Sequence, residues 1–178
     1  MAIPLDINDR LKYLSAAERE RWARFSSQVT GGSAERKDVW RKQWQMNLNL
    51  VGAMHQKGVG IMAGTDVGNP YVYPGFGLHD ELVLLVKAGL TPMAALQAAT
   101  MNPARFLNME NDLGTVQKGK IADLVLLNAN PLEDIANTQR ISAVVMNGRY
   151  LPRETLQKML DEVEASARKT ERPRRGRN

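Results

Sequence analysis

The feature that most constrains this chain is a short apolar run that ends in an aspartate between two glycines. Residues 59–63 form the run, and Gly64-Thr65-Asp66 follow it. The run is long enough for one buried strand and too short for a helix. In parallel α/β folds, chemistry is placed at the carboxyl ends of strands, where Asp66 would emerge. Asp66 is therefore the best candidate for a working residue, and the alternative is a turn aspartate that caps the next element.

Two helices are predicted before this strand. Ser15 and Glu18 have the spacing of a capping box and indicate a helix to about residue 27. Ser33 can cap a second helix, which runs to about residue 57 and ends at Gly58. Side chains at steps of three and four form one stripe on this helix: Trp40, Trp44, Leu48, Val51 and His55. On that stripe, His55 is interpreted as a structural histidine rather than a ligand.

After Asp66 the pattern continues with a loop and helices. Residues 69–77 combine turn formers with aromatic residues, which can line a pocket or simply pack. A helix is predicted over residues 78–88, closed by Gly89-Leu90, with four side chains directed inward: Leu78, Leu82, Leu85 and Val86. Thr91-Pro92 predicts the start of another helix, and Asn102-Pro103 predicts a short one through residue 107.

The last third of the chain reads as strands followed by a helix. Strands are predicted over residues 121–127, which contain Asp123, and over residues 141–146. Asn147-Gly148 is a strong hairpin signal. Residues 153–167 have the pattern of an amphipathic surface helix.

Length and composition limit the number of domains and the kinds of site that this chain can hold. A chain of 178 residues suits one domain, or one domain with an appendage. Cysteine is absent, which excludes disulfides and cysteine-ligated metal sites. No apolar stretch is long enough for a membrane span, and the first residues do not have the pattern of a signal peptide. A cytoplasmic location is the default expectation.

The positive net charge of the chain is concentrated at its end. Residues 168–178 hold six of the 24 basic residues and one of the 19 acidic ones, which leaves 18 of each elsewhere. A nucleic-acid-binding domain would carry a basic face on its folded part. The expectation is therefore a disordered basic tail, and the alternative is an arm that binds nucleic acid or an acidic partner.

Few residues of this chain are candidates for catalysis or metal binding. His79 lies thirteen positions after Asp66 and begins the predicted helix, so the two could share a site. Two residues make a weak metal signal, because a firm site needs at least three ligands. The sequence contains no phosphate-binding loop, nucleophile elbow or paired zinc-binding histidines.

Several motifs in order resemble the end of an amidohydrolase-superfamily enzyme, of the imidazolonepropionase-like and Xaa-Pro dipeptidase-like branch. They are the stretch from Gly58 to Asp66, His79-Asp80-Glu81-Leu82, the segments over residues 87–100 and 102–105, residues 113–127, and Val144 to Arg149. The similarity covers roughly residues 45–150.

The resemblance implies an α/β fold: the last βα units of a TIM-type (β/α)8 barrel, part of a small composite β-sandwich, and a C-terminal helix. It implies these divisions: residues 1–110 in the barrel, 111–150 in the sandwich, 151–167 in a surface helix and 168–178 in the basic tail. Asp66 matches the aspartate that ends the eighth barrel strand, which in the family binds a metal and accepts a proton from the hydrolytic water. His79 would contact substrate, and Asp123 would be structural.

The sequence also departs from the family. The first-strand His-x-His, the bridging residue of the fourth strand and the histidines of the fifth and sixth strands have no counterpart, since the chain holds only two histidines. A barrel of this type needs about 250 residues. The expectation is therefore a C-terminal portion whose divalent metal, expected to be zinc, binds only if other polypeptide supplies the missing ligands.

The function implied is metal-dependent hydrolysis of a C–N bond in a small amide or dipeptide, and the alternative is a non-catalytic fragment or interaction module. A partial barrel leaves a strand edge and an apolar helix face uncovered. We therefore expect the isolated chain to be unstable, to form a homo-oligomer, or to pair with a complementary chain. No membrane partner is expected.

Overall fold

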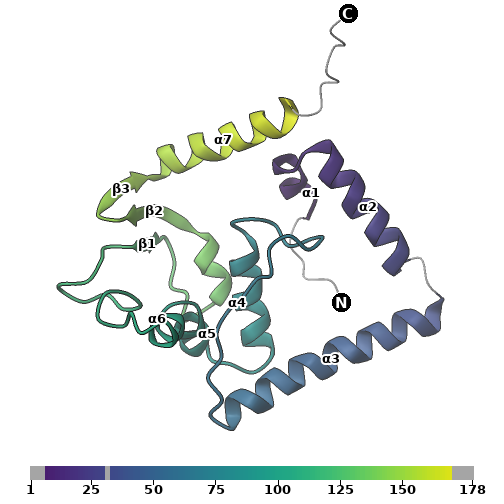
Figure 1. Cartoon of the computed structure of the whole chain (residues 1–178), viewed down its shortest axis with the longest axis horizontal. Helices are drawn as coiled ribbons and strands as arrows, with labels where there is room; N and C mark the ends of the chain where they lie inside the picture. Colours follow the sequence, from purple (N-terminus) through teal and green to yellow (C-terminus); the bar gives the residue numbers. More distant parts are fainter. Residues whose placement is uncertain (1–6, 31–32, 170–178) are drawn as a thin grey trace, which may run out of the picture.

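The computed structural model describes residues 7–30 and 33–169, and most of the predicted basic tail lies outside them. Helices dominate the first part of the chain: α1 (Ile7–Arg10), η1 (Leu11–Tyr13), α2 (Ala16–Thr30), α3 (Ala34–Gln56), α4 (Gly77–Lys87), α5 (Pro92–Ala99) and α6 (Met101–Phe106). Then come β1 (Leu124–Leu127), η2 (Ile135–Gln139), β2 (Ile141–Met146), β3 (Arg149–Pro152) and α7 (Arg153–Lys169). In Figure 1, α4 lies near the centre, with α2, α3 and α7 arranged around it.

The predicted helix caps before Asp66 are confirmed. Glu18 accepts the backbone N–H of Ser15 at 3.0 Å, while the Ser15 hydroxyl accepts the N–H of Glu18 at 3.3 Å. These reciprocal bonds satisfy donors that the first turn of α2 leaves free. Ser33 caps α3 through the N–H of Arg36. Gly58 ends α3 with φ +79°, a left-handed conformation that glycine adopts without steric cost.

The buried strand predicted at residues 59–63 is wrong, because this segment belongs to no sheet. A strand requires a neighbour with which to exchange backbone hydrogen bonds, and here the neighbours are helical. The Ala63 N–H donates to the carbonyl of Ala98 in α5 at 2.9 Å, and the Asn102 side chain donates to the carbonyl of Ile61 at 2.8 Å. The segment is also only half buried, since Met62 is 44% exposed.

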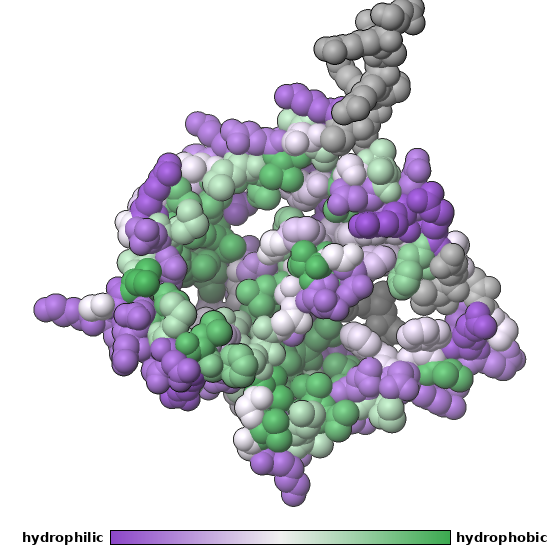
Figure 2. All heavy atoms as spheres, in the orientation of Figure 1, coloured by the Kyte–Doolittle hydropathy of each residue, from purple (hydrophilic) through white to green (hydrophobic). Residues whose placement is uncertain are grey.

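The main core lies between α4, α5 and η2. Its buried side chains are Leu82, Leu85, Leu90, Ala95, Ala98 and Ile135, and Ile61 and Ala63 pack against it. Of the four side chains expected to point inward from α4, Leu82 and Leu85 are buried, and Leu78 is exposed. In the space-filling view, apolar atoms gather over the region where α3 ends and where α4 and α5 lie (Figure 2).

Two helix starts differ in how well the sequence predicted them. The Thr91 hydroxyl accepts the N–H of Ala94 at 3.1 Å and caps α5, with Pro92 in the first turn, as predicted. Asn102 does not cap α6, which begins after Thr100 and has no side-chain cap. The Asn102 amide is used instead to hold the carbonyl of Ile61, so a long-range contact replaces the local one.

The sheet is a three-stranded antiparallel meander in the order β1-β2-β3. The predicted hairpin is confirmed, since Asn147 and Gly148 both have positive φ, +48° and +77°. Asp123 accepts the N–H of Asn147 at 2.6 Å, which agrees with the structural role expected for it. Strand β1 begins at Leu124 rather than at residue 121, because Asp123 N–H donates to Ile121 and closes a turn there.

Helix α3 is only partly covered. Its apolar stripe is buried at Leu48 and half-buried at Val51 and His55, but Trp40 is 55% and Trp44 is 44% exposed. The first half of this stripe therefore faces solvent. Within the described residues, no helix has the length and apolar character needed to cross a bilayer.

Candidate functional site

Asp66 lies in a tight turn that follows segment 59–63, which has no regular secondary structure. Its φ is +50°, a left-handed conformation that is uncommon outside glycine, although aspartate tolerates it better than most residues. The exposed carboxylate accepts the Asn69 side-chain amide at 2.6 Å, and the same amide also donates to the Asp66 carbonyl at 3.3 Å. The turn therefore presents the carboxylate to solvent in a fixed backbone conformation.

Glu81, on α4, holds the start of this turn. Its Oε1 accepts the Gly64 N–H at 2.8 Å, two residues before Asp66. Asp66, Asn69 and Glu81 thus form one connected arrangement. Sequence reasoning gave Glu81 no role beyond its place in a family motif, because its partner lies 17 residues away and leaves no local signal.

Arg10 and Asp80 form a second polar arrangement on α4 that sequence reasoning missed. Arg10 Nη1 lies 2.7 Å from Asp80 Oδ2, and both side chains are largely buried. Arg10 Nη2 donates to Gln139 at 3.1 Å, and the guanidinium lies 4.7 Å from the ring centroid of Phe76. These contacts dock the N-terminal α1 onto α4 and η2, from positions up to 129 residues apart.

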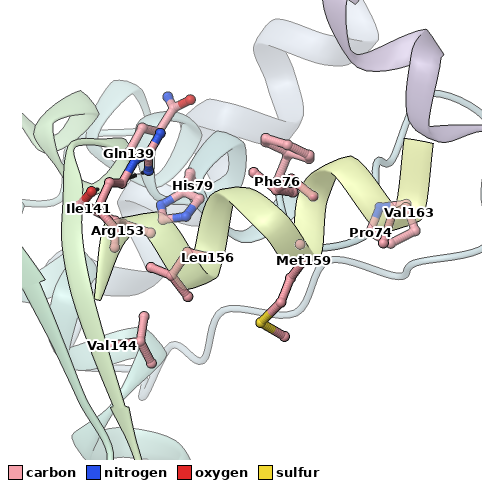
Figure 3. Close-up of a pocket in the computed structure, with 12 residues that line it drawn as sticks. Pro74, Phe76, His79, Gln139, Ile141, Val144, Arg153, Leu156, Met159 and Val163 are labelled. Atoms are coloured by element: carbon pink, nitrogen blue, oxygen red, sulfur yellow. Dashed lines mark hydrogen bonds between the residues drawn. The ribbon is translucent and has the colours of Figure 1, made fainter. Parts of the chain in front are cut away.

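His79 lies half-buried on α4. Its Nδ1 lies 3.0 Å from the hydroxyl of Thr138 in η2. Burial lowers the pKa of His79; Asp80 raises it and Arg10 lowers it further, both by smaller amounts. His79 lines an apolar cavity of about 430 Å³ that is bounded by β2 and α7 (Figure 3). Asp66 is not among the residues that line this cavity.

A smaller cavity of about 290 Å³ lies between α3 and α4, beside the Asp66 turn. Trp44 and Leu48 form part of its apolar wall, and Gly64 and Glu81 form a polar edge. The glycine and the carboxylate that fix the turn are therefore next to the partly exposed stripe of α3.

The described residues do not fit a metal ion by themselves. Within residues 7–30 and 33–169, no group of three or more histidine, cysteine, aspartate or glutamate side chains could hold one, and stable sites need that many protein ligands. Asp66 is bonded to Asn69 and His79 to Thr138, and the structure does not bring the two together. Any metal site that includes Asp66 needs ligands from outside these residues.

Comparison with protein families and curated proteins gives one consistent result. Residues 45–151 match the profile described as "Amidohydrolase family". Adenine deaminase 4 of Rhizobium meliloti (strain 1021) is 38% identical over 79 residues, which is 44% of this chain and 12% of that protein. The imidazolonepropionase of Deinococcus deserti (strain DSM 17065) is 38% identical over 88 residues, 49% of this chain and 22% of that protein.

Solved structures that resemble this chain include enzymes with the same kind of name. A Xaa-Pro dipeptidase with methionine bound in its active site is 34% identical, with a TM-score of 0.55 over 59% of this chain and 25% of that one. A bottromycin amidohydrolase, at 22% identity, has a TM-score of 0.75 over 92% of this chain and 36% of its own, which concerns the fold alone. The chain thus spans between an eighth and a little over a third of the proteins it matches.

Proposed function

This chain belongs to the amidohydrolase family, which is hydrolytic and generally uses a divalent metal, and we propose that it serves metal-dependent hydrolysis of C–N bonds in small amides or dipeptides. Relatives named as adenine deaminase, imidazolonepropionase and Xaa-Pro dipeptidase support a small substrate with a C–N bond. The matched proteins are longer, so the proposal concerns the chain together with further barrel polypeptide, of the same or another molecule.

The proposed architecture follows the family match. Residues 1–110 would form the last βα units of a TIM-type barrel, and residues 111–150 part of a composite β-sandwich. Residues 151–167 would be a surface helix and 168–178 a basic tail. Segment 59–63 is compatible with this proposal, because it joins no sheet within the described residues and a barrel strand would find its partners on the additional polypeptide.

Asp66 is the proposed catalytic residue and the one metal ligand that this chain supplies. The observation that carries the proposal is its position: a solvent-facing carboxylate just after segment 59–63, fixed by Glu81 and Asn69, within the matched region. A carboxylate in such a place can accept a proton from an attacking water. The metal, proposed to be zinc, would need its other ligands from the additional polypeptide.

For His79 we propose contact with the substrate. The residue lines the large cavity, and its lowered pKa favours the neutral imidazole near pH 7. This role is separate from that of Asp66, which does not line the cavity.

The test is metal analysis and hydrolysis of an amide and dipeptide panel, after gentle purification of the chain with whatever polypeptide it binds. The expected result is a divalent metal in the assembly and hydrolysis of at least one panel member, both lost in Asp66→Asn. If no divalent metal copurifies and no panel member is hydrolysed, the proposal fails.

A second candidate function is a non-catalytic interaction module. The half-exposed Trp40 and Trp44 on α3 favour it, because large exposed aromatic side chains on one helix face are typical of contact surfaces. An assembly that forms through α3 and contains no metal would support this candidate over the first.

A further inference from the structure

The large cavity is formed entirely by this chain. Loop residue Phe76 and His79 form one wall, Ile141 of β2 lies on another, and Leu156 and Met159 of α7 cover it. Figure 3 shows these side chains on both sides of α7, with His79 behind the helix. A concave site of 300–1,000 Å³ with a mainly apolar wall and a few polar groups is typical of small-molecule binding, and the volume of about 430 Å³ falls in that range.

The hydrogen bonds of Thr138 favour one tautomer of His79. The Thr138 hydroxyl is buried and donates its one hydrogen to the Ile135 carbonyl at 2.9 Å. The same oxygen can then only accept from His79 Nδ1, 3.0 Å away. This arrangement favours the tautomer with the proton on Nδ1. Nε2 keeps its lone pair and has no partner in the described part of the chain, so it is a hydrogen-bond acceptor at the cavity.

Two other polar side chains of the cavity wall, Gln139 and Arg153, already form some hydrogen bonds within the chain. Gln139 Oε1 accepts from Arg10 Nη2 at 3.1 Å, which leaves the amide N–H groups of Gln139 able to donate. Arg153 donates to the Ile141 carbonyl at 3.3 Å. The cavity thus offers an acceptor on His79 and a donor on Gln139, surrounded by apolar side chains.

We propose that this cavity binds small apolar molecules that carry one hydroxyl group, of the alkylphenol class. The hydroxyl donates to His79 Nε2 and can accept from the Gln139 amide. The ring packs against Phe76 and Met159, since aromatic rings and thioethers both make favourable contacts with a ring. A ligand charge would lose its hydration among these apolar side chains, which favours a neutral ligand.

The experiment titrates the full chain with 4-propylphenol and with propylbenzene, which has the same apolar body without the hydroxyl. Isothermal titration calorimetry measures both. We expect saturable binding of one 4-propylphenol per chain, about fivefold tighter than propylbenzene, because a net hydrogen bond is worth about that factor. In His79→Phe this preference for 4-propylphenol should shrink, because only the Gln139 amide remains to bond the hydroxyl.

A matched pair of variants tests whether the probe occupies this cavity. Met159→Trp places a larger side chain in the cavity wall, and Met93→Trp makes the same change on α5, outside the cavity. The two methionines are equally exposed, at 50% and 48%, so the effects on folding should be similar. Met159→Trp should weaken 4-propylphenol binding at least tenfold, whereas Met93→Trp should leave it unchanged.

Equal affinity of the unsubstituted chain for the two probes, or undiminished binding by a folded Met159→Trp, would overturn the proposal. Because binding is measured directly, the outcome is independent of hydrolysis. Failure of binding would remove the role proposed for His79 but not that for Asp66. Failure of hydrolysis would leave the cavity proposal standing.

Discussion

Arg10 Nη1 and Asp80 Oδ2 lie 2.7 Å apart, and this ion pair joins the N-terminal helix to the centre of the molecule. Both side chains are largely buried, so removal of one partner leaves the other as an uncompensated charge. We predict that Asp80→Ala lowers the free energy of unfolding by about 3 kcal/mol. Urea denaturation followed by circular dichroism measures the change.

The control for this prediction is an exposed pair. Lys42 and Asp38 on α3 lie 2.9 Å apart at the surface, and surface pairs of this kind contribute little. Lys42→Ala should change the free energy of unfolding far less than Asp80→Ala does. A similar, small effect for both variants would show that the Arg10–Asp80 pair does not hold the N-terminal helix in place.

The hydrogen bond from Gly64 to Glu81 should protect the amide of Gly64 from exchange with solvent. Glu81→Ala removes the acceptor, so the Gly64 amide hydrogen should exchange about tenfold faster or more, as expected for loss of a charge-assisted bond. Hydrogen exchange observed by NMR provides the measurement. Glu133→Ala, which removes an exposed acceptor of Asn130, is the control and should leave Gly64 unchanged. Slow exchange at Gly64 in Glu81→Ala would contradict the proposed support of the turn.

Stability should fall as the solution is acidified through the range in which His79 titrates. The pKa of His79 is lowered in the folded chain, chiefly by burial, so below about pH 6.5 the unfolded state takes up a proton that the folded state resists. The free energy of unfolding should therefore be constant above about pH 7 and decline as the pH falls below about 6.5. Urea melts at each pH measure it.

Replacing each histidine in turn tests whether His79 causes this decline in stability. His79→Phe should flatten the decline, whereas His55→Gln should leave it in place, because His55 lies half-buried on α3 and not in the core contact with Thr138. An unchanged slope in His79→Phe would show that another group causes the decline.

The exposed part of the α3 stripe should promote association. Trp40 and Trp44 lie one turn apart and face solvent, and burial of apolar surface is the main driving force of association. We predict that the chain forms oligomers in a concentration-dependent way and that Trp44→Lys shifts the equilibrium towards monomer. Analytical ultracentrifugation over a range of concentrations measures this. A dilute monomer that melts sharply and cooperatively would contradict the prediction.

The sequence predicted the features that depend on neighbouring residues. The capping box at Ser15, the cap at Ser33 and the Asn147-Gly148 hairpin each rest on groups a few positions apart, and all three are present. The helices that the sequence predicts lie within a few residues of their observed bounds, since periodicity and caps are local signals. The short α1, η1 and η2 were not predicted.

Features that depend on distant partners could not be predicted in this way. The apolar pattern of residues 59–63 indicates a strand, but pairing requires a neighbouring strand, and Ala63 meets the helix α5 instead. Arg10 has no local signal, because its partners lie 70 and 129 residues away. Within the candidate site, Asp66 stood out by its glycine-bounded position, whereas the supporting Glu81 and the Thr138 contact of His79 appear only in three dimensions.

The most direct test compares two aspartate-to-asparagine variants in the native assembly by their hydrolysis of a panel amide or dipeptide. Asp66→Asn removes the proposed base and ligand. Asp123→Asn keeps an oxygen that can accept the N–H of Asn147, so it serves as the structural control. We predict that Asp66→Asn lowers kcat by a factor of about 10² to 10⁴ and releases the divalent metal. Asp123→Asn should keep both the unsubstituted kcat and the metal. Full activity in Asp66→Asn would contradict the proposed role of this residue.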